Sequence, residues 1–328
     1  MYQSINMPLC PETVEAFESW EGLRRDCAAL GVDGVEGIWA GVDIPADFPK
    51  DLLVGYHLTF YPDWLDFYRE DKQALRRKFG SVEKAYEAYG TRDHDFLRKL
   101  YREDLLRAAS LGAKYVVFHV SDVSMEECYT FSWLHSDKEV IDASAEVLND
   151  VMHDLPLDFE LLLENQWCAG FRFTDPNLTA HMLDAVQYEK RGILLDTGHL
   201  MITRPQIRSQ MDAVRYIQIM LDKHGSLSQY IHGMHLHQSL SGAYIRRTVG
   251  ADKFAAMPED FLESYGGHYA HIQKLDRHRP WTYPGIANVL TRITPRYLTH
   301  ELSAPIRKAR MQATGRQIQA LKNGGMFL

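Results

Sequence analysis

The sequence predicts an α/β fold in which a single (β/α)8 barrel carries helical insertions after its third and seventh strands. Three observations predict this fold. Eight short apolar runs alternate along the chain with stretches of helical periodicity. No Ser/Gly-rich linker divides the chain, which favours one domain over residues 1–328. The length of 328 residues suits one barrel with insertions, at about 63–95 and 239–275.

The expected strands are short and apolar, as strands buried on both faces of a parallel barrel are. They cover 3–7, 34–39, 52–58, 114–120, 158–165, 193–195 and 230–237, and the eighth ends at Glu301. Glu36 interrupts the second apolar run. We expect it to form an ordinary ion pair at the barrel rim, with a position facing the barrel mouth as the alternative.

The first helix is expected to begin near Glu12, because apolar residues recur at three- and four-residue steps from Val14 to Leu30, and Gly31 is suited to end it. Asp175 and Pro176 form a typical helix start. The other barrel helices are expected over 95–111, 137–155, 205–224 and 286–293, with a C-terminal helix from Ala304.

The first insertion has charges of alternating sign around apolar spacers, which indicates two short helices with breaks near Gly80 and Gly90. Its basic residues, Lys72, Arg76, Arg77 and Lys78, are expected on a solvated face. The second insertion is expected to include a helix over 258–265. Long loops on the catalytic side of a barrel usually shape the substrate site.

Composition narrows the possible partners. Lys and Arg number 36 against 44 Asp and Glu, so the net charge of −8 gives no global attraction to nucleic acid or to an anionic membrane. The four cysteines form no CxxC pair, which argues against a thiolate zinc site and a disulfide framework. No signal peptide and no apolar stretch of about 20 residues is visible. We therefore expect a cytoplasmic protein.

Polar residues mark the carboxyl ends of the expected strands, where α/β barrels carry out their chemistry. These residues are His57, His119, Glu164, Asp196 with His199, His235 with His237, and Glu301. Burying so many polar groups without a shared partner is costly. Imidazoles and carboxylates together suit a divalent cation, with zinc favoured and manganese or iron as alternatives.

The strand ends resemble the xylose-isomerase-like TIM barrel superfamily, which includes AP endonuclease family 2 (endonuclease IV) and the sugar phosphate isomerases and epimerases. The matching motifs are LLLEN, LLDTGHL, GMHLH and HELSAP. A later DRH triplet, with Asp276 and His278, is similar to the endonuclease IV branch in particular. Strand seven departs from that branch, since it reads HLHQS where the family tends to have an aspartate near Gln238.

The resemblance implies up to three metal ions. His57 and His119 would bind the first, with Glu164 bridging to a second. The second would be held by Asp196, His235 and Glu301, and the third by His199, Asp276 and His278.

Three functions remain open. The first is a metal-dependent phosphoesterase in which Arg246, Arg247 or Arg277 offsets phosphate charge and Trp167 shields the site from water. The second is a single-metal sugar or keto-acid isomerase or epimerase, in which Glu164 and Glu301 transfer a proton and His199 hydrogen-bonds the substrate. The third is a metal-stabilised binding protein without turnover. A small phosphoester or sugar is the expected ligand, and the net charge disfavours nucleic acid.

Overall fold

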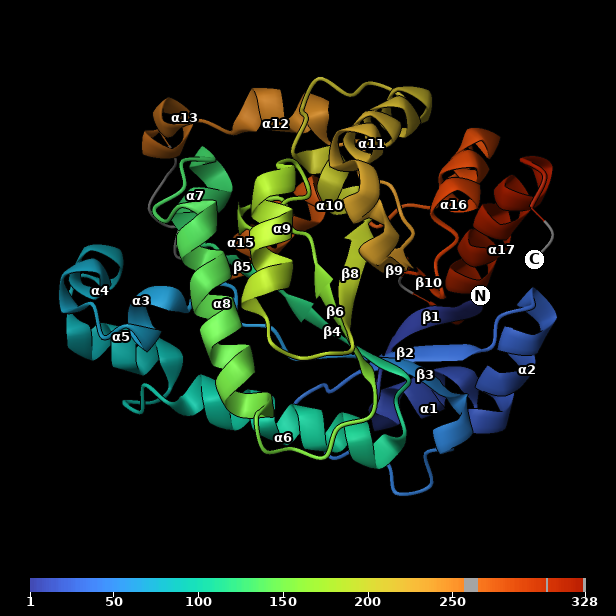
Figure 1. The fold of residues 1–328 in the computed structure, drawn as a ribbon, viewed down its shortest axis with the longest axis horizontal. Helices are drawn as coiled ribbons and strands as arrows, with labels where there is room; N and C mark the ends of the chain where they lie inside the picture. Colours follow the sequence, from blue (N-terminus) through green and yellow to red (C-terminus); the bar gives the residue numbers. More distant parts are fainter. Residues whose placement is uncertain (257–264, 305, 327–328) are drawn as a thin grey trace.

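Parallel strands close into an eight-stranded barrel in the computed structural model, which describes residues 1–256, 265–304 and 306–326 (Figure 1). The strands are β1 (Tyr2–Pro8), β2 (Gly34–Ile38), β3 (Leu53–His57), β4 (Tyr115–His119), β6 (Glu160–Glu164), β8 (Arg191–Asp196), β9 (Ile231–His235) and β10 (Tyr297–His300). Their order around the barrel is β1-β10-β9-β8-β6-β4-β3-β2. The predicted (β/α)8 fold is confirmed.

A two-stranded antiparallel sheet of β5 (Ser121–Asp122) and β7 (Ala169–Gly170) joins the loops that follow β4 and β6. The helices that surround the barrel and its loops are α1 (Pro11–Phe17), α2 (Trp20–Leu30), α6 (Phe96–Leu111), α7 (Met125–Thr130), α8 (Asp137–Met152), α9 (Pro176–Ala185), α10 (Thr197–Ile202), α11 (Gln210–His224), α16 (Ala287–Ile293) and α17 (Arg307–Asn323). Short 3-10 turns cover Lys50–Leu52, Gly225–Tyr230 and Pro284–Ile286.

The expected first helix is two helices. Glu18 ends α1 in a left-handed conformation with φ 70°, and the Ser19 side chain caps α2 by accepting a hydrogen bond from the backbone N–H of Gly22. The apolar spacing nevertheless continues across the break, because Phe17, Trp20 and Leu23 all pack into the core. The apolar spacing therefore predicted the buried face of both helices correctly, but it did not predict the break at Glu18 and Ser19.

Between β3 and α6 the structure has three short helices, where two were expected: α3 (Leu65–Tyr68), α4 (Lys72–Phe79) and α5 (Val82–Tyr89). Phe67, Leu75, Ala85 and Tyr89 form an apolar cluster that holds them together. The expectation of a solvated Lys78 was wrong. Its Nζ lies 2.6 Å from Asp63 Oδ1 and 2.7 Å from Asp66 Oδ2, and its side chain is buried.

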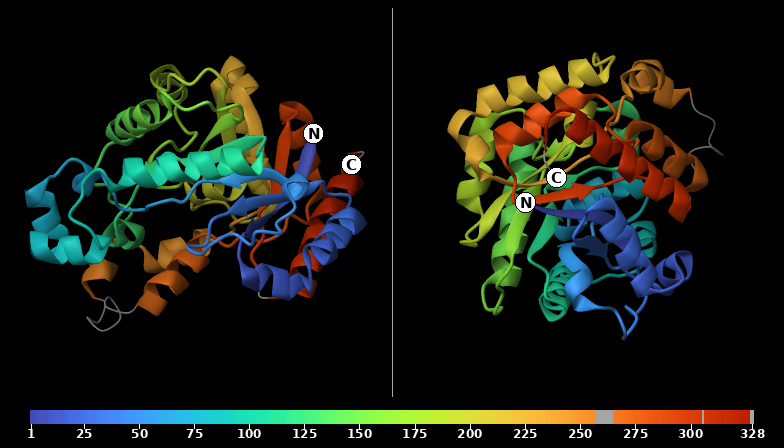
Figure 2. Two further views of the ribbon diagram at one scale, coloured as in Figure 1. Left: turned by 90° about the horizontal axis from the view of Figure 1, so that it is seen from below. Right: turned by 90° about the vertical axis from the view of Figure 1, so that its right-hand side faces the viewer.

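The chain between β9 and β10 forms α12 (Gly242–Thr248), α13 (Ala251–Ala255) and α15 (Tyr265–Leu275). The helix predicted over 258–265 lies outside the described residues, apart from Tyr265 at the start of α15. Helices α3, α4 and α5 and helices α12, α13 and α15 lie at the end of the molecule away from the two termini (Figures 1 and 2). They flank the end of the barrel at which the candidate site lies.

Glu36 lies inside the barrel, which corrects the expectation of an ion pair at the rim. It is 2% exposed and accepts hydrogen bonds from Tyr115 Oη at 2.6 Å and Thr299 Oγ1 at 2.8 Å. Gly55 makes this possible, because a Cβ there would lie 2.1 Å from Tyr115 Cζ. The absence of a side chain at this position of β3 therefore lets the Tyr115 ring cross the barrel interior.

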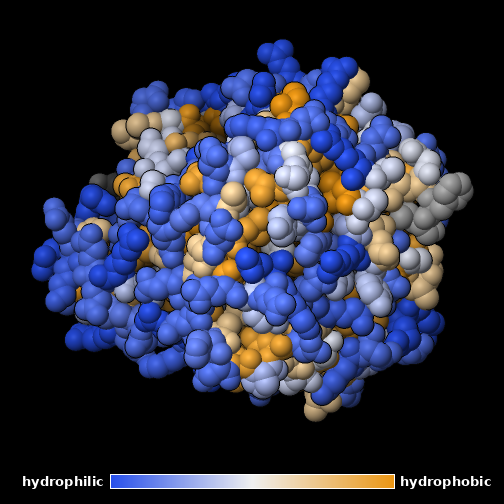
Figure 3. All heavy atoms as spheres, in the orientation of Figure 1, coloured by the Kyte–Doolittle hydropathy of each residue, from blue (hydrophilic) through white to orange (hydrophobic). Residues whose placement is uncertain are grey.

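Hydrophilic side chains cover most of the face shown in Figure 3, with apolar residues scattered among them. Within the described part of the chain, no helix is both long and apolar enough to cross a membrane.

Candidate metal centre

The parallel strands bring polar side chains together at one end of the barrel. His57, His119, Glu164, Asp196 and His235 are the last residues of β3, β4, β6, β8 and β9, and Glu301 follows β10 directly. Because parallel strands all end at the same mouth of a barrel, these residues converge although they are far apart in sequence. They belong to overlapping candidate groups, three of which are described below, and a fourth is made of Asp196, His237 and Glu301.

The first group is His57, His119 and Glu164. Glu164 Oε2 lies 3.3 Å from His57 Nε2 and 3.0 Å from His119 Nε2. The Leu58 carbonyl lies 2.8 Å from His57 Nδ1 and accepts its proton, which leaves the Nε2 lone pair directed toward the group. This pattern is typical of an imidazole oriented for a metal.

The second group surrounds His235 Nδ1. Glu301 Oε2 lies 3.2 Å from this nitrogen, Glu164 Oε1 lies 3.5 Å away and Asp196 Oδ2 lies 3.7 Å away. The other ring nitrogen of His235 faces Glu36. Since Glu164 also belongs to the first group, its two oxygens connect the two groups.

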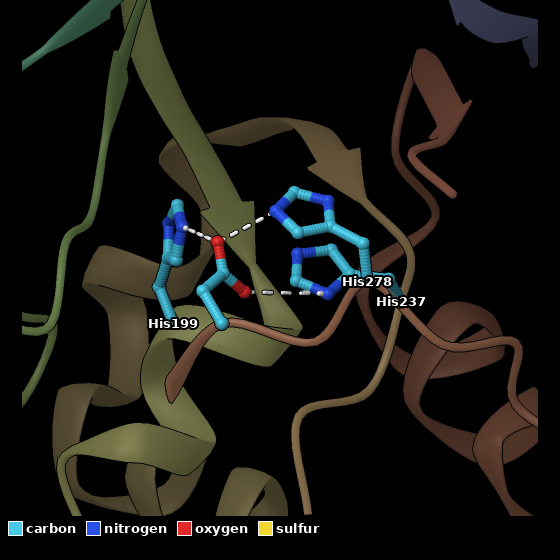
Figure 4. Close-up of side chains that lie close together, drawn as sticks. His199, His237 and His278 are labelled. Carbon is cyan, nitrogen blue, oxygen red and sulfur yellow. Dashed lines mark hydrogen bonds and ion pairs between the residues drawn. The ribbon is translucent and has the colours of Figure 1, made fainter. Parts of the chain in front are cut away.

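The third group is His199, His237, Asp276 and His278 (Figure 4). Asp276 Oδ2 lies 3.1 Å from His199 Nε2 and 2.5 Å from His278 Nε2. Asp276 Oδ1 lies 3.9 Å from His237 Nδ1. The DRH segment follows no strand, and its contacts with His199 and His237 hold it against the barrel mouth.

The local sequence explains how α10 delivers His199. Asp196 is the N-cap of this helix, and its Oδ1 accepts a hydrogen bond of 2.6 Å from the backbone N–H of His199. Asn165 accepts a hydrogen bond from the Asp196 N–H at 2.8 Å and donates to the Asp196 carbonyl at 3.1 Å. The short DTGH sequence therefore provides both a carboxylate and an imidazole at one point of the rim.

The donor set fits divalent cations. In each group the ligand atoms lie within 4.8 Å of one another. Four buried atoms of these side chains have no hydrogen-bond partner among the described residues: Glu164 Oε2, His235 Nδ1, His237 Nδ1 and Glu301 Oε2. Each unpaired buried polar atom lowers the stability of the fold by about 1–3 kcal/mol. Several such atoms that converge on one point therefore indicate that they bind a common cation. Imidazole nitrogens with carboxylate oxygens suit zinc, manganese or iron.

The carboxylates of Glu164 and Asp276 are ionised. Burial raises the pKa of Glu164, but the imidazoles of His119 and His235 outweigh burial and hold this pKa well below its usual range. Asp276 behaves in the same way, with its pKa lowered by His278 and His199 against the effect of burial. The pKa of His278 is raised to about 10, because Asp276 overcomes the effect of burial. Bound cations would replace the positive charge that protonated imidazoles otherwise supply.

Sequence reasoning left two residues out of the site. His237 was grouped with His235 by strand alternation but was not given a ligand role, and it lies in the third group. Glu36, expected at the rim, supports His235 from inside the barrel. A carboxylate in the middle of an apolar strand and the repeated histidine of HLH were the signals for these two residues.

The arginines suggested as phosphate ligands lie elsewhere. Arg246 is exposed and donates to the Pro205 carbonyl, and Arg277 is exposed and donates to the Leu240 carbonyl at 3.0 Å. The Arg247 guanidinium lies 6.0 Å from the centre of the Tyr244 ring. The structure therefore does not bring these three side chains to the metal groups.

A cavity of about 720 Å³ opens beside the first and third groups, where His119, His199 and Asp276 line it. Six aromatic residues form much of its wall: Phe60, Tyr61, Phe79, Tyr89, Trp167 and Tyr269. Phe60 stacks on the His119 ring with 4.7 Å between the centres. Trp167 is buried and stacks on Phe131. Lysine and arginine are absent from the wall in the described ranges.

Comparisons with known proteins agree with the observed architecture. No protein-family model and no curated protein matches the sequence. Endonuclease IV from Thermus thermophilus aligns with a TM-score of 0.51 at 13% identity, over 98% of this chain and 100% of that one. A sugar phosphate isomerase/epimerase from Parabacteroides distasonis aligns with a TM-score of 0.52 at 11% identity, over 99% and 95%. The chain therefore shares the barrel fold of these two solved structures.

Proposed function

We propose that this protein is a metal-dependent hydrolase of small phosphoesters with a multinuclear centre. The observation that carries the proposal is the linkage of the groups through shared carboxylates. Glu164 Oε2 faces His57 and His119, whereas Glu164 Oε1 lies 3.1 Å from His199 Nδ1 and 3.5 Å from His235 Nδ1. A carboxylate placed in this way suits neighbouring cations better than a single one.

The bound cations would supply Lewis acidity to phosphoryl oxygens and lower the pKa of water. The chain's own residues provide the arrangement. His57, His119 and Glu164 would hold one cation, and Asp196, His235 and Glu301 would complete a second site with Glu164. His199, Asp276 and His278 would hold a third. Zinc suits this mixture of nitrogen and oxygen ligands, with manganese or iron as alternatives.

The cavity supports a small organic substrate. Its aromatic wall lies directly beside His119 and His199, so a molecule bound there reaches the metal groups. With no lysine or arginine in the described part of the wall, phosphate charge would be offset by the centre itself. The remainder of the substrate would be uncharged and apolar or aromatic, because it packs against rings such as Tyr61 and Trp167.

A second candidate is a single-metal isomerase or epimerase of a sugar or keto acid. It is favoured by the position of Glu301 and Glu164, which both approach His235 Nδ1 and so place two carboxylates at one metal. One would remove a proton beside a substrate carbonyl and the other would return it. This reaction leaves His57, His119, Asp276 and His278 without a role.

The test uses the full chain reconstituted with zinc or manganese. We expect hydrolysis of bis(p-nitrophenyl) phosphate or p-nitrophenyl phosphate, and at least an about 100-fold loss of kcat/KM in Glu164→Gln, equivalent to about 3 kcal/mol. Glu160→Gln is a matched control, because Glu160 lies at the opposite end of the same strand. Fully loaded protein that isomerises ketoses and hydrolyses neither ester would contradict the proposal. A chain that does neither would support the non-catalytic alternative.

A further inference from the structure

We infer that His237 is a fourth protein ligand of the third group and that the cation held there is structural. The inference concerns the coordination of one group and does not depend on which reaction the neighbouring groups catalyse. It rests on the position of the His237 ring, on the contacts that fix this ring, and on the number of ligands that result.

The His237 imidazole presents a free nitrogen to the third group. Its ring is 0% exposed. Asp196 Oδ2 lies 2.9 Å from Nε2 and accepts its hydrogen bond, so the hydrogen bond to Asp196 occupies Nε2. Nδ1 then has a lone pair and no hydrogen-bond partner among the described residues. This nitrogen is the one that faces Asp276 (Figure 4).

The surroundings fix the ring in this position. It stacks on His278 with 4.1 Å between the centres and planes 6° apart. The His237 carbonyl accepts hydrogen bonds from Thr197 Oγ1 at 2.6 Å and from Trp281 Nε1 at 2.8 Å. Gly198 leaves room for the ring, because a Cβ at that position would lie 2.0 Å from His237 Cε1. A pre-positioned imidazole of this kind binds a metal without reorganisation.

The resulting ligand number separates the third group from the first. His199, His237, His278 and Asp276 give three nitrogens and one oxygen, which completes the tetrahedral shell of a structural zinc. His57, His119 and Glu164 give three ligands, and a three-ligand site keeps a position for water or substrate. A closed third site ties the DRH segment to α10 and to the chain that follows β9.

The test removes His237 Nδ1 and measures whether the Co²⁺ ion of the third group then binds azide. A Glu164→Gln chain, in which the first two groups are disrupted, is loaded with one equivalent of Co²⁺. Loss of this ion in Glu164→Gln/Asp276→Ala assigns it to the third group. We expect a four-coordinate absorption spectrum that azide does not change. Adding His237→Asn should lower the Co²⁺ affinity by at least about 100-fold, because loss of a residue that only supports a ligand already costs up to about 100-fold. Any Co²⁺ spectrum that remains should change when azide is added.

Two further variants keep the inference falsifiable. Gly198→Ala retains His237 but displaces its ring, and we expect the same loss of affinity. His271→Asn removes a buried imidazole that stacks on Tyr129, outside the metal groups, and should leave the spectrum unchanged. The inference is overturned if azide alters the Co²⁺ spectrum while His237 is present. It is also overturned if His237→Asn removes an additional ion from a chain that already lacks Asp276 and His278. In that case His237 binds a cation through Nε2, together with Asp196 and Glu301.

Discussion

Glu36 Oε1 lies 2.9 Å from Nε2 of His235 in the interior of the barrel. Burial raises the pKa of Glu36, but the imidazoles of His235 and His57 lower it overall, so the side chain is ionised. An ionised carboxylate at this position keeps the proton on Nε2 and directs the lone pair of Nδ1 toward Glu301 and Glu164. The pair therefore orients a candidate metal ligand from the side opposite to the solvent.

Glu36→Gln should weaken the metal bound through His235 by about 10–100-fold, because loss of such a supporting carboxylate has this effect in other metal sites. The measurement is competition for Zn²⁺ with a chromophoric chelator. Tyr115→Phe is the matched control, since it removes one hydrogen bond to Glu36 and keeps the carboxylate. It should cost about 1 kcal/mol of stability and leave the affinity within a few-fold. Equal affinity in wild type and Glu36→Gln would show that the pair only supports folding.

Asp276→Ala combined with His278→Ala should remove one ion while the barrel still folds. Both residues lie on a segment that follows no strand, so the hydrogen bonds between strands are unaffected. Elemental analysis of protein purified without chelator should find two or three ions in wild type and one fewer in the double variant. Arg277→Ala, an exposed residue of the same turn, should leave the count unchanged. An unchanged count in the double variant would remove this segment from the site.

The sequence predicted which polar side chains converge at the strand ends better than it predicted the residues that support them. His57, His119, Glu164, Asp196 and His235 each end an apolar run, and parallel strands in a barrel must bring such ends together. Glu36 is held beside His235 by Tyr115, and the Tyr115 ring fits only because Gly55 has no side chain. This arrangement depends on residues of several strands. A pattern read along one strand cannot contain that information.

The predicted boundary of the first helix was wrong because it depends on a side-chain contact that the apolar spacing does not contain. The apolar spacing from Val14 to Leu30 reports which face is buried, whereas the break depends on the Ser19 side chain accepting a hydrogen bond from Gly22. Lys78 was assigned to solvent because its neighbours in sequence are charged. Its partners Asp63 and Asp66 come from the chain before α4. Charge pattern alone does not distinguish a solvated cation from one that is paired in the interior.

A DNA duplex containing an abasic site should bind weakly, with a Kd no tighter than about 10⁻⁶ M at physiological salt. The chain carries a net charge of −8, and the described wall of the cavity contains no lysine or arginine. Any binding should weaken steeply as salt rises, because it would depend on phosphate contacts. Fluorescence anisotropy at several salt concentrations, with an intact duplex as control, measures both quantities. Tight binding selective for the abasic duplex would contradict the argument from charge.

His135→Gln should destabilise the fold more at acidic than at alkaline pH. His135 Nε2 lies 3.0 Å from Asp66 Oδ1, and this contact raises the pKa of His135 although burial opposes it. A histidine whose pKa is raised on folding stabilises the native state fully below its unfolded pKa of about 6.5, and that contribution is lost as the pH rises through the folded pKa. The Tm difference between wild type and variant should therefore be larger at pH 5.5 than at pH 9. His153→Gln, at an exposed position after α8, controls for general effects of histidine removal. A difference that grows with pH would mean that His135 is neutral beside Asp66.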